Sequence, residues 1–349
     1  VYTIHNLALQ GIRPLTDHSS AFTSWFPGLG FRYNEVVDPR YHDCINPMAV
    51  AIRLADKINT VSPTYALEIL EPDEPAHGFY GGEGLELDLQ VAARQGRLVG
   101  ILNGCDYMAE ASRRPAWKLL RDSMLDALRL WISNTTHVHS AHYLMLTRIT
   151  AQLRRKPAAI FLSVGRITLQ KVGLFLQLTS SGRTALEEIL DGLGTGELMV
   201  FLGNGDRELE RALTQLANRH KNFVFLKGYL DELPDLLYRS ADLFLMPSTF
   251  EPCGISQMLA LRESVPCVVH GVGGLKDTID HQRTGFVFDG DSPAEQADNF
   301  VEAVRAAQLM RSTEPERWQK ICDAAGAARF SWEHSARDYA RELYDDTNS

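Results

Sequence analysis

One acidic residue stands where it could bind a sugar. Glu251 lies in the run Ser248-Thr-Phe-Glu-Pro-Cys-Gly254, between an apolar segment and a helix that we expect from Ile255 onward. Free backbone N–H groups at a helix start can donate to sugar or phosphate oxygens, and a nearby carboxylate can accept from two neighbouring hydroxyls. Glu251 could equally cap the helix, so the residue types alone leave both interpretations open.

Two cations, Arg166 and Lys171, form a second candidate pair. Arg166 comes shortly after the apolar run 159–163, and Lys171 follows five residues later. Two cations at the carboxyl end of a strand could clamp a diphosphate and stabilise it as a leaving group. Taken alone, the pair is explained more simply as surface charge.

Glycine turns and one histidine give weaker signals. The run Leu202-Gly-Asn-Gly-Asp206 resembles part of a dinucleotide-binding fingerprint but lacks its third glycine. Gly273 and Gly274 precede a further helix and are competent for unspecific anion contact. His5 lies just beyond the apolar run 1–4, where it could face a cleft or serve the structure.

Histidines and cysteines do not form a metal motif. His137, His139 and His142 lie close together, but no Cys or carboxylate stands at ligand spacing, so we expect a helix surface there. The five cysteines are scattered, which indicates reduced thiols in a cytoplasmic protein. They are Cys44, Cys105, Cys253, Cys267 and Cys322.

Apolar runs separated by amphipathic stretches must position these residues. We expect strands at 159–163, 198–202, 223–226, 243–246 and 266–270, and a helix over 232–240. Fully apolar strands that alternate with helices predict a doubly wound α/β domain, a parallel sheet covered on both faces. Its ligand should lie at the carboxyl ends of the strands.

The first part of the chain is less regular. Strands are expected at 1–4, 57–61 and 98–102, and residues 104–157 are expected to be mostly helical. Residues 11–43 are rich in aromatics, Pro and Gly without a clear period, which is typical of a surface excursion.

Composition limits the class of protein. The 349 residues suffice for two domains, and 45% hydrophobic with 23% charged residues is the balance of a soluble globular protein. The apolar runs are too short to cross a membrane. A net charge of −9 argues against nucleic acid as a partner, although a few placed cations could still bind a phosphate. The sequence gives no indication of oligomeric state.

Longer runs together carry a family resemblance. In the first part they are Thr3-Ile-His-Asn-Leu-Ala-Leu-Gln-Gly11, Thr60-Val-Ser-Pro-Thr-Tyr-Ala66 and Gly100-Ile-Leu-Asn-Gly-Cys-Asp106. Later they are Arg166-Ile-Thr-Leu-Gln-Lys171, Lys227-Gly-Tyr229, Ala241-Asp-Leu-Phe-Leu-Met-Pro-Ser-Thr-Phe-Glu-Pro-Cys-Gly254, Gly273-Gly-Leu-Lys-Asp-Thr278 and Phe330-Ser-Trp332. Over nearly the whole chain, these runs resemble the glycogen and starch synthases of bacteria and plants.

The resemblance implies a fold and a reaction. The fold is GT-B, in which two Rossmann-like, doubly wound domains face a cleft. The reaction moves glucose from ADP-glucose (UDP-glucose in some relatives) to the 4-OH end of an α-1,4-glucan such as glycogen, with retention at the anomeric carbon. It implies no metal or other cofactor. It also suits front-face substitution, in which the departing diphosphate helps to activate the acceptor hydroxyl.

The resemblance also assigns roles to residues. It makes Arg166 and Lys171 the phosphate-binding pair, Glu251 the carboxylate that holds the glucose hydroxyls, and His5 a catalytic histidine near the glucose. The donor-binding residues that it implies, with Tyr229 beside the adenine and Ser256 near the phosphate, are Asn103, Gly205, Asp206, Tyr229, Cys253, Gly254, Ile255, Ser256, Gly273 and Gly274.

The chain departs from the family pattern in three places. No Lys-x-Gly-Gly-Leu loop precedes Val1, where the chain starts without Met, so we expect an incomplete N-terminal domain. Val172 stands between Lys171 and Gly173, where the family usually has Lys-Gly. The family's Trp after the Asn-Gly-x-Asp run has no counterpart in residues 108–112.

We expect three parts: a partial, acceptor-side domain over 1–103, a nucleotide-sugar-binding domain over 104–330, and a helix within 331–349 that returns to the first domain. Two alternatives to the synthase stay open. One is a non-catalytic glucan- or nucleotide-binding fragment, and the other is a related glycosyltransferase with another donor or acceptor.

Overall fold

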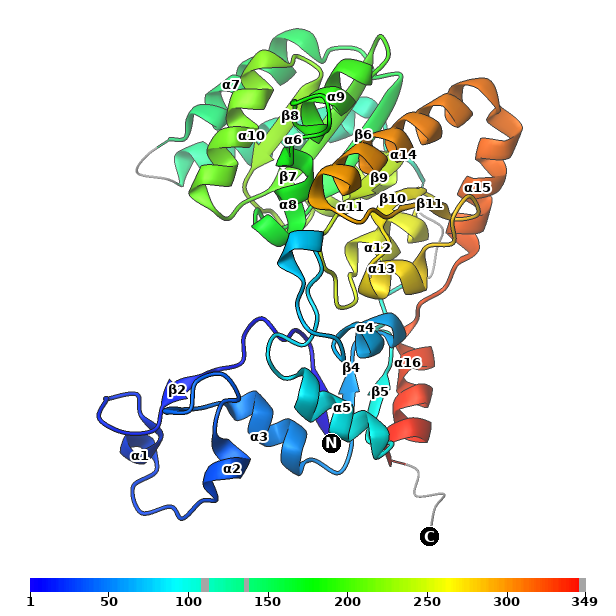
Figure 1. Ribbon diagram of the computed structural model, residues 1–349. Helices are drawn as coiled ribbons and strands as arrows, with labels where there is room; N and C mark the ends of the chain where they lie inside the picture. Colours follow the sequence, from blue (N-terminus) through cyan, green and yellow to red (C-terminus); the bar gives the residue numbers. More distant parts are fainter. Residues whose placement is uncertain (108–112, 135–137, 345–349) are drawn as a thin grey trace.

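Two parallel sheets, each flanked by helices, form the two main parts of the protein, and a short antiparallel pair of strands adds to them (Figure 1). The computed structural model describes residues 1–107, 113–134 and 138–344. Residues 1–100 supply the smaller sheet, and residues 159–288 supply the larger one. The two-part α/β arrangement expected from the sequence is therefore confirmed.

The larger sheet has six parallel strands in the order β11-β10-β9-β6-β7-β8. Their bounds are β6 Ala159–Val164, β7 Glu197–Gly203, β8 Phe223–Lys227, β9 Leu243–Met246, β10 Cys267–His270 and β11 Gly285–Phe288. Nearly all of these residues are buried, which confirms five predicted strands. The edge strand β11 was not expected, although its Gly-Phe-Val-Phe run is apolar.

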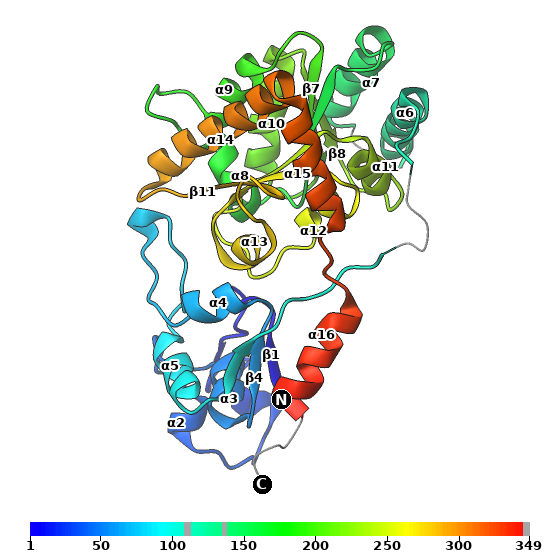
Figure 2. The ribbon, with the colours of Figure 1, turned by 90° about the vertical axis from the view of Figure 1, so that its right-hand side faces the viewer.

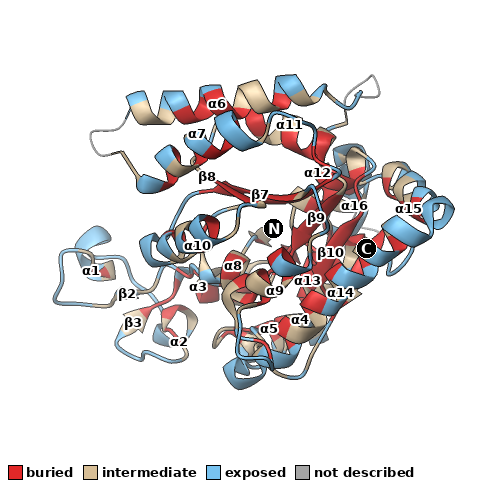
Figure 3. Ribbon diagram, turned by 90° about the horizontal axis from the view of Figure 1, so that it is seen from above, coloured by how far each residue is buried: buried red, intermediate tan, exposed pale blue. Residues whose placement is uncertain are grey.

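Helices cover both faces of this sheet, as Figure 3 shows. On one side lie α6 (Trp117–Ser133), α7 (Ser140–Gln152) and α11 (Leu233–Ser240). On the other lie α8 (Leu169–Leu176), α9 (Ala185–Gly192), α10 (Arg207–Arg219) and α14 (Pro293–Thr313). Because the chain leaves β6 toward β7 but returns beside β6 with β9, the loops after β6 and β9 diverge and open a crevice.

The smaller sheet has three parallel strands in the order β1-β4-β5. These strands span Tyr2–Ile4, Ile58–Thr60 and Leu98–Gly100, as predicted. Their apolar side chains pack with α3 (Pro47–Leu54), α4 (Pro63–Glu68) and α5 (Glu86–Arg94). The expected surface excursion over 11–43 contains β2 (Arg13–Pro14), α1 (Phe22–Trp25) and α2 (Tyr33–Val36), most of its residues are exposed, and β3 (Cys44–Ile45) follows it directly.

The last helices run back from the large sheet to the small one. After α15 (Pro315–Ala327), α16 (Trp332–Tyr339) and a π-helical turn (Ala340–Tyr344) lie beside the small sheet (Figure 2). The Ser335 hydroxyl donates to the Leu102 carbonyl at 2.7 Å, and the Asn59 amide donates to the Tyr339 hydroxyl at 3.0 Å. The domain boundaries at 103/104 and 330/331 stay a prediction.

The expectation of a histidine-bearing helix surface was wrong for His142. This residue of α7 is buried, and its Nε2 lies 2.8 Å from the Lys227 carbonyl oxygen. Burial lowers the pKa of His142, so the ring is neutral near pH 7. His137 and residues 108–112 lie outside the described residues.

Candidate functional site

A cavity of about 570 Å³ opens between the two sheets, at the divergence of the loops after β6 and β9. Its lower lining comes from the end of β1 and from the segments after β4 and β5, and its upper lining from the segments after β6, β7, β8 and β9. The cavity therefore lies where a doubly wound sheet is expected to bind its ligand.

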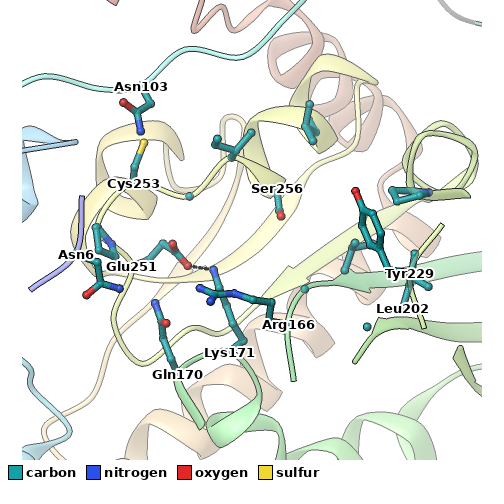
Figure 4. A pocket seen from close by; sticks show the side chains of 18 of the residues that line it. Asn6, Asn103, Arg166, Gln170, Lys171, Leu202, Tyr229, Glu251, Cys253 and Ser256 are labelled. Carbon is teal, nitrogen blue, oxygen red and sulfur yellow. Dashed lines mark hydrogen bonds and ion pairs between the residues drawn. The ribbon is translucent and has the colours of Figure 1, made fainter. Parts of the chain in front are cut away.

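Ten of the fourteen residues that the sequence singles out line this cavity. They are His5, Asn103, Arg166, Lys171, Tyr229, Glu251, Cys253, Gly254, Ile255 and Ser256. Gly205, Asp206, Gly273 and Gly274 do not line it. Figure 4 labels seven of these ten residues: Asn103, Arg166, Lys171, Tyr229, Glu251, Cys253 and Ser256.

Glu251 and Lys171 form an ion pair inside the cavity (Figure 4). Their side chains are only 8% and 17% exposed, so water screens this pair less than a surface pair. The Ser248 hydroxyl also donates to the Glu251 carboxylate at 3.1 Å. Because α12 (Ser256–Arg262) has Ile255 at its N-cap position and no side-chain cap, the interpretation of Glu251 as a helix cap is wrong.

The glycine turn at the start of α13 (Gly273–Thr278) supports the backbone of Glu251. The Gly274 N–H donates to the Glu251 carbonyl at 3.0 Å. Gly273 has φ +44°, and a Cβ there would lie 2.0 Å from the same carbonyl oxygen. Both glycines thus lie behind the carboxylate, and their role in donor binding stays a prediction.

A buried histidine fixes the other end of the Glu251 loop. The ring of His270 lies in the core, where burial lowers its pKa. A neutral ring can donate from Nδ1 to the Ser248 carbonyl, 3.0 Å away, and the ring stacks on Phe288 at 5.2 Å. No pattern in the sequence pointed to His270, because its partner lies 22 residues earlier.

Arg166 and the first turn of α8 provide the cationic wall. Arg166 is exposed and lies next to Lys171 in the cavity (Figure 4). Gln170, which was not predicted, donates from its side-chain amide to the Phe250 carbonyl at 2.9 Å. Its backbone carbonyl accepts the Thr249 N–H, also at 2.9 Å. The turn that carries Lys171 is therefore tied to the loop that carries Glu251.

The far end of the cavity is formed by the loops after β7 and β8. Tyr229 is 62% exposed there, and its carbonyl accepts from the Trp131 indole at 3.1 Å. Asp206 instead caps α10, since its carboxylate accepts the N–H groups of Glu208 and Leu209 at 2.9 and 3.1 Å. Gly205 donates its N–H to Glu210 at 2.9 Å. For both residues, donor binding stays a prediction.

The small sheet contributes His5 and Asn103 to the opposite wall. His5 follows β1 directly, as expected, and its neighbour Asn6 also lines the cavity. Asn103 lies close to Cys253, whose pKa is raised to about 12 by burial, so the thiol stays protonated. Three polar lining residues that were missed, Asn6, Gln170 and Asn204, each adjoin a predicted one.

Neither a metal-binding cluster nor a membrane-spanning helix is found in the part of the chain that the structure describes. Within it, no group of three or more His, Cys, Asp or Glu side chains is placed to hold a metal ion. None of the helices in the same residues combines the length and apolar character needed to cross a bilayer.

Comparison with known families gives two matches. Residues 1–91 match the family described as starch synthase catalytic domain, and residues 158–306 match the glycosyl transferases group 1. The second match contains Arg166, Lys171 and Glu251, and the first contains His5.

Individual relatives agree with these matches. The chain is 34% identical to the glycogen synthase of Yersinia pestis (strain Pestoides F), over 97% of this chain and 66% of that protein. The glycogen synthase of Yersinia enterocolitica gives the same figures. The catalytic domain of starch synthase IV from Arabidopsis thaliana, solved with ADP and acarbose, has 25% identity and a TM-score of 0.69 over 97% of this chain and 65% of that one. The chain thus spans about two thirds of the length of these relatives, 66% for the curated ones.

Proposed function

The chain belongs to the family of glycogen and starch synthases, and from that premise we propose that it is an ADP-glucose-dependent glucosyltransferase. In this proposal it adds glucose to the non-reducing 4-OH end of an α-1,4-glucan such as glycogen, with retention at the anomeric carbon. Residues 1–103 form the acceptor side, residues 104–330 hold the donor, and residues 331–349 return to the first part.

One observation carries the proposal: the buried Glu251 carboxylate faces Lys171 and Arg166 in one cavity. A carboxylate can accept hydrogen bonds from two neighbouring glucose hydroxyls, while two cations can hold a diphosphate. A nucleoside diphosphate sugar contains both groups joined at one carbon. The ADP in the Arabidopsis relative supports adenine as the base, and the exposed ring of Tyr229 offers it a stacking surface.

The remaining cavity residues extend this arrangement. At the start of α12, the backbone N–H groups of Gly254, Ile255 and Ser256 are available to donate to phosphate or sugar oxygens. His5 approaches from the other sheet, on the side where the glucose and the acceptor would meet. In this proposal the large-sheet wall binds the donor, and the small-sheet wall lies where the donor glucose meets the acceptor.

The proposed reaction is a front-face substitution. The bond between the anomeric carbon and the diphosphate oxygen breaks while the acceptor O4 bonds to the same face of that carbon. The proton of the acceptor hydroxyl passes to a diphosphate oxygen, so ADP leaves as the conjugate acid and no separate base is needed. Arg166 and Lys171 stabilise the charge that develops on the departing diphosphate.

We further propose a cytoplasmic location, which the five free cysteines support because a reducing compartment keeps thiols unpaired. No metal or other cofactor takes part in the proposed reaction.

The test is glucose incorporation into glycogen by the natural full-length protein, with ADP-glucose and UDP-glucose supplied in parallel. Transfer from ADP-glucose with release of one ADP per glucose is the expected result. Transfer from UDP-glucose alone would correct the donor. Binding of ADP without transfer from either donor would favour a non-catalytic binding protein.

A further inference from the structure

Two short helices from different parts of the chain meet at the boundary between the sheets. Figures 1 and 2 both show α4, beside the small sheet, directly below α13, beside the large one. The Asp277 carboxylate, near the end of α13, accepts the Thr64 N–H at 2.8 Å and the Thr64 hydroxyl at 2.7 Å. In the opposite direction, the Glu68 carboxylate at the end of α4 accepts the Gly273 N–H at 2.8 Å.

Each helix therefore supplies the carboxylate for the first turn of the other. The N–H groups at a helix start have no partner within the helix and carry a partial positive charge. A carboxyl oxygen accepts such N–H groups whether or not it is ionised, and the hydrogen bond is stronger when the acceptor is charged. The two contacts run in opposite directions, so together they resist both sliding and rotation of α4 against α13.

The same helix pair touches both walls of the candidate site. The hydroxyl of Ser62, the N-cap residue of α4, donates to the Pro252 carbonyl at 2.6 Å. At the start of α13, Gly274 holds the Glu251 carbonyl at 3.0 Å. On the other side of α4, the Tyr65 hydroxyl accepts the Leu7 N–H at 3.2 Å, two residues beyond His5.

We infer that Thr64, Glu68 and Asp277 are positioning residues, which act through the α4–α13 contact to hold the Glu251 loop at a fixed spacing from His5. The inference rests on the proposed function and deepens it. None of the three residues lines the cavity, so each acts through the backbone of residues that do. Loss of the contact allows the two walls to separate, which lowers the rate of glucosyl transfer.

A purely structural role predicts a different result. If the contact only stabilised the fold, its loss would lower the melting temperature and leave kcat unchanged. A matched control is Thr184→Val, which removes the side chain that caps α9 within the large-sheet unit, away from the α4–α13 contact. Removal of such a cap is expected to destabilise the protein about as much as loss of the Thr64–Asp277 hydrogen bonds.

The kinetic test compares five variants of the natural full-length protein. Asp277→Ala loses both bonds to Thr64 and is expected to lower kcat about tenfold, with little change in the KM for ADP-glucose. Asp277→Asn keeps an acceptor and a donor at that position and should restore kcat to within about threefold. Thr64→Val should lower kcat and Thr64→Ser should not. Thr184→Val should lower the melting temperature but keep kcat. Wild-type kcat in Asp277→Ala would overturn the inference.

A second measurement needs no turnover. Exchange of the Thr64 and Gly273 amide hydrogens reports opening of the contact directly, because each amide donates across it. Asp277→Ala should speed exchange at Thr64 about tenfold, and ADP should slow exchange at both amides in the wild type. Absence of transfer from any donor would refute the proposed function alone, and this exchange would still test the contact. Unchanged exchange at Thr64 in Asp277→Ala, or faster exchange with wild-type kcat, would refute the positioning role.

Discussion

Removal of Lys171 tests the ion pair at the centre of the cavity. In Lys171→Met the chain keeps its length and apolar character but loses the ammonium group, so the Glu251 carboxylate stays buried without its charged partner. Breaking a buried pair by removing one partner costs about 3–5 kcal/mol. Because Lys171 is 17% and Glu251 8% exposed, some water reaches the pair, and we expect a loss of about 2–3 kcal/mol in the free energy of unfolding.

A double-mutant cycle is completed by variants that remove the charge of Glu251, alone and together with that of Lys171. Glu251→Gln keeps the shape and an acceptor for the Ser248 hydroxyl, which lies 3.1 Å away. In the double variant neither charge is left unpaired, so the loss should be smaller than the sum of the single losses by about 1–2 kcal/mol.

The assay is urea unfolding followed by intrinsic fluorescence for the wild type, both single variants and the double variant. ADP is left out, since a ligand selective for the folded state would raise every value. Additivity of the two single losses to within about 0.5 kcal/mol would refute the reasoning, because it would mean that the two side chains do not interact in solution.

Three further predictions concern the surroundings of the pair. Gly273→Ala should lower the free energy of unfolding by about 2 kcal/mol or more and the rate of glucose transfer at least about tenfold, because Gly273 has a positive φ and lies against the Glu251 carbonyl. The control Gly182→Ala, where φ is +80° but the surrounding space is open, should cost only about 1 kcal/mol and keep kcat. Tyr229→Ala should weaken ADP binding in calorimetry about tenfold, while Tyr229→Phe should bind nearly as the wild type does. An equal loss in both would assign the effect to the hydroxyl. Burial raises the pKa of Glu68 from 4.5 to about 7, so its carboxyl keeps its proton in the folded state where the unfolded chain has lost it. Its stabilising contribution is complete below pH 4.5 and is lost as the pH rises through 7, by about 3 kcal/mol measured as the difference in unfolding free energy between wild type and Glu68→Gln. A difference that stays flat over this range would contradict the shift. The charged and titratable groups around Glu68 that the buffer series must take into account are Asp277, Lys276, Glu74, His77, His270, Asp289 and Asp291.

Local patterns in the sequence were enough to predict most strands, and with them the strand ends at which the cavity loops begin. Fully apolar runs identified five strands of the large sheet, because a strand buried on both faces admits few polar side chains. The short edge strand β11 was missed, since four apolar residues between polar neighbours do not distinguish a strand from a turn. The lining residues that were predicted follow the ends of strands, where parallel strands bring distant loops together.

Contacts between distant residues could not be predicted in this way. The ion pair of Glu251 depends on Lys171, 80 residues away. The burial of His142 depended on the Lys227 carbonyl, 85 residues away. The α4–α13 contact joins residues separated by 213 positions, and no period in the chain reports such a pairing.

The central claim is that Glu251 holds the glucose of an activated donor. It is tested most directly by the rate of glucose incorporation into glycogen from ADP-glucose, measured for the wild type and Glu251→Ala together with ADP affinity. We predict a loss in kcat of about a thousandfold, the size expected when a key electrostatic contact of the transition state is removed, with ADP affinity changed by less than about threefold. Turnover within about tenfold of the wild type would contradict the claim, since Glu251 would then be dispensable for transfer.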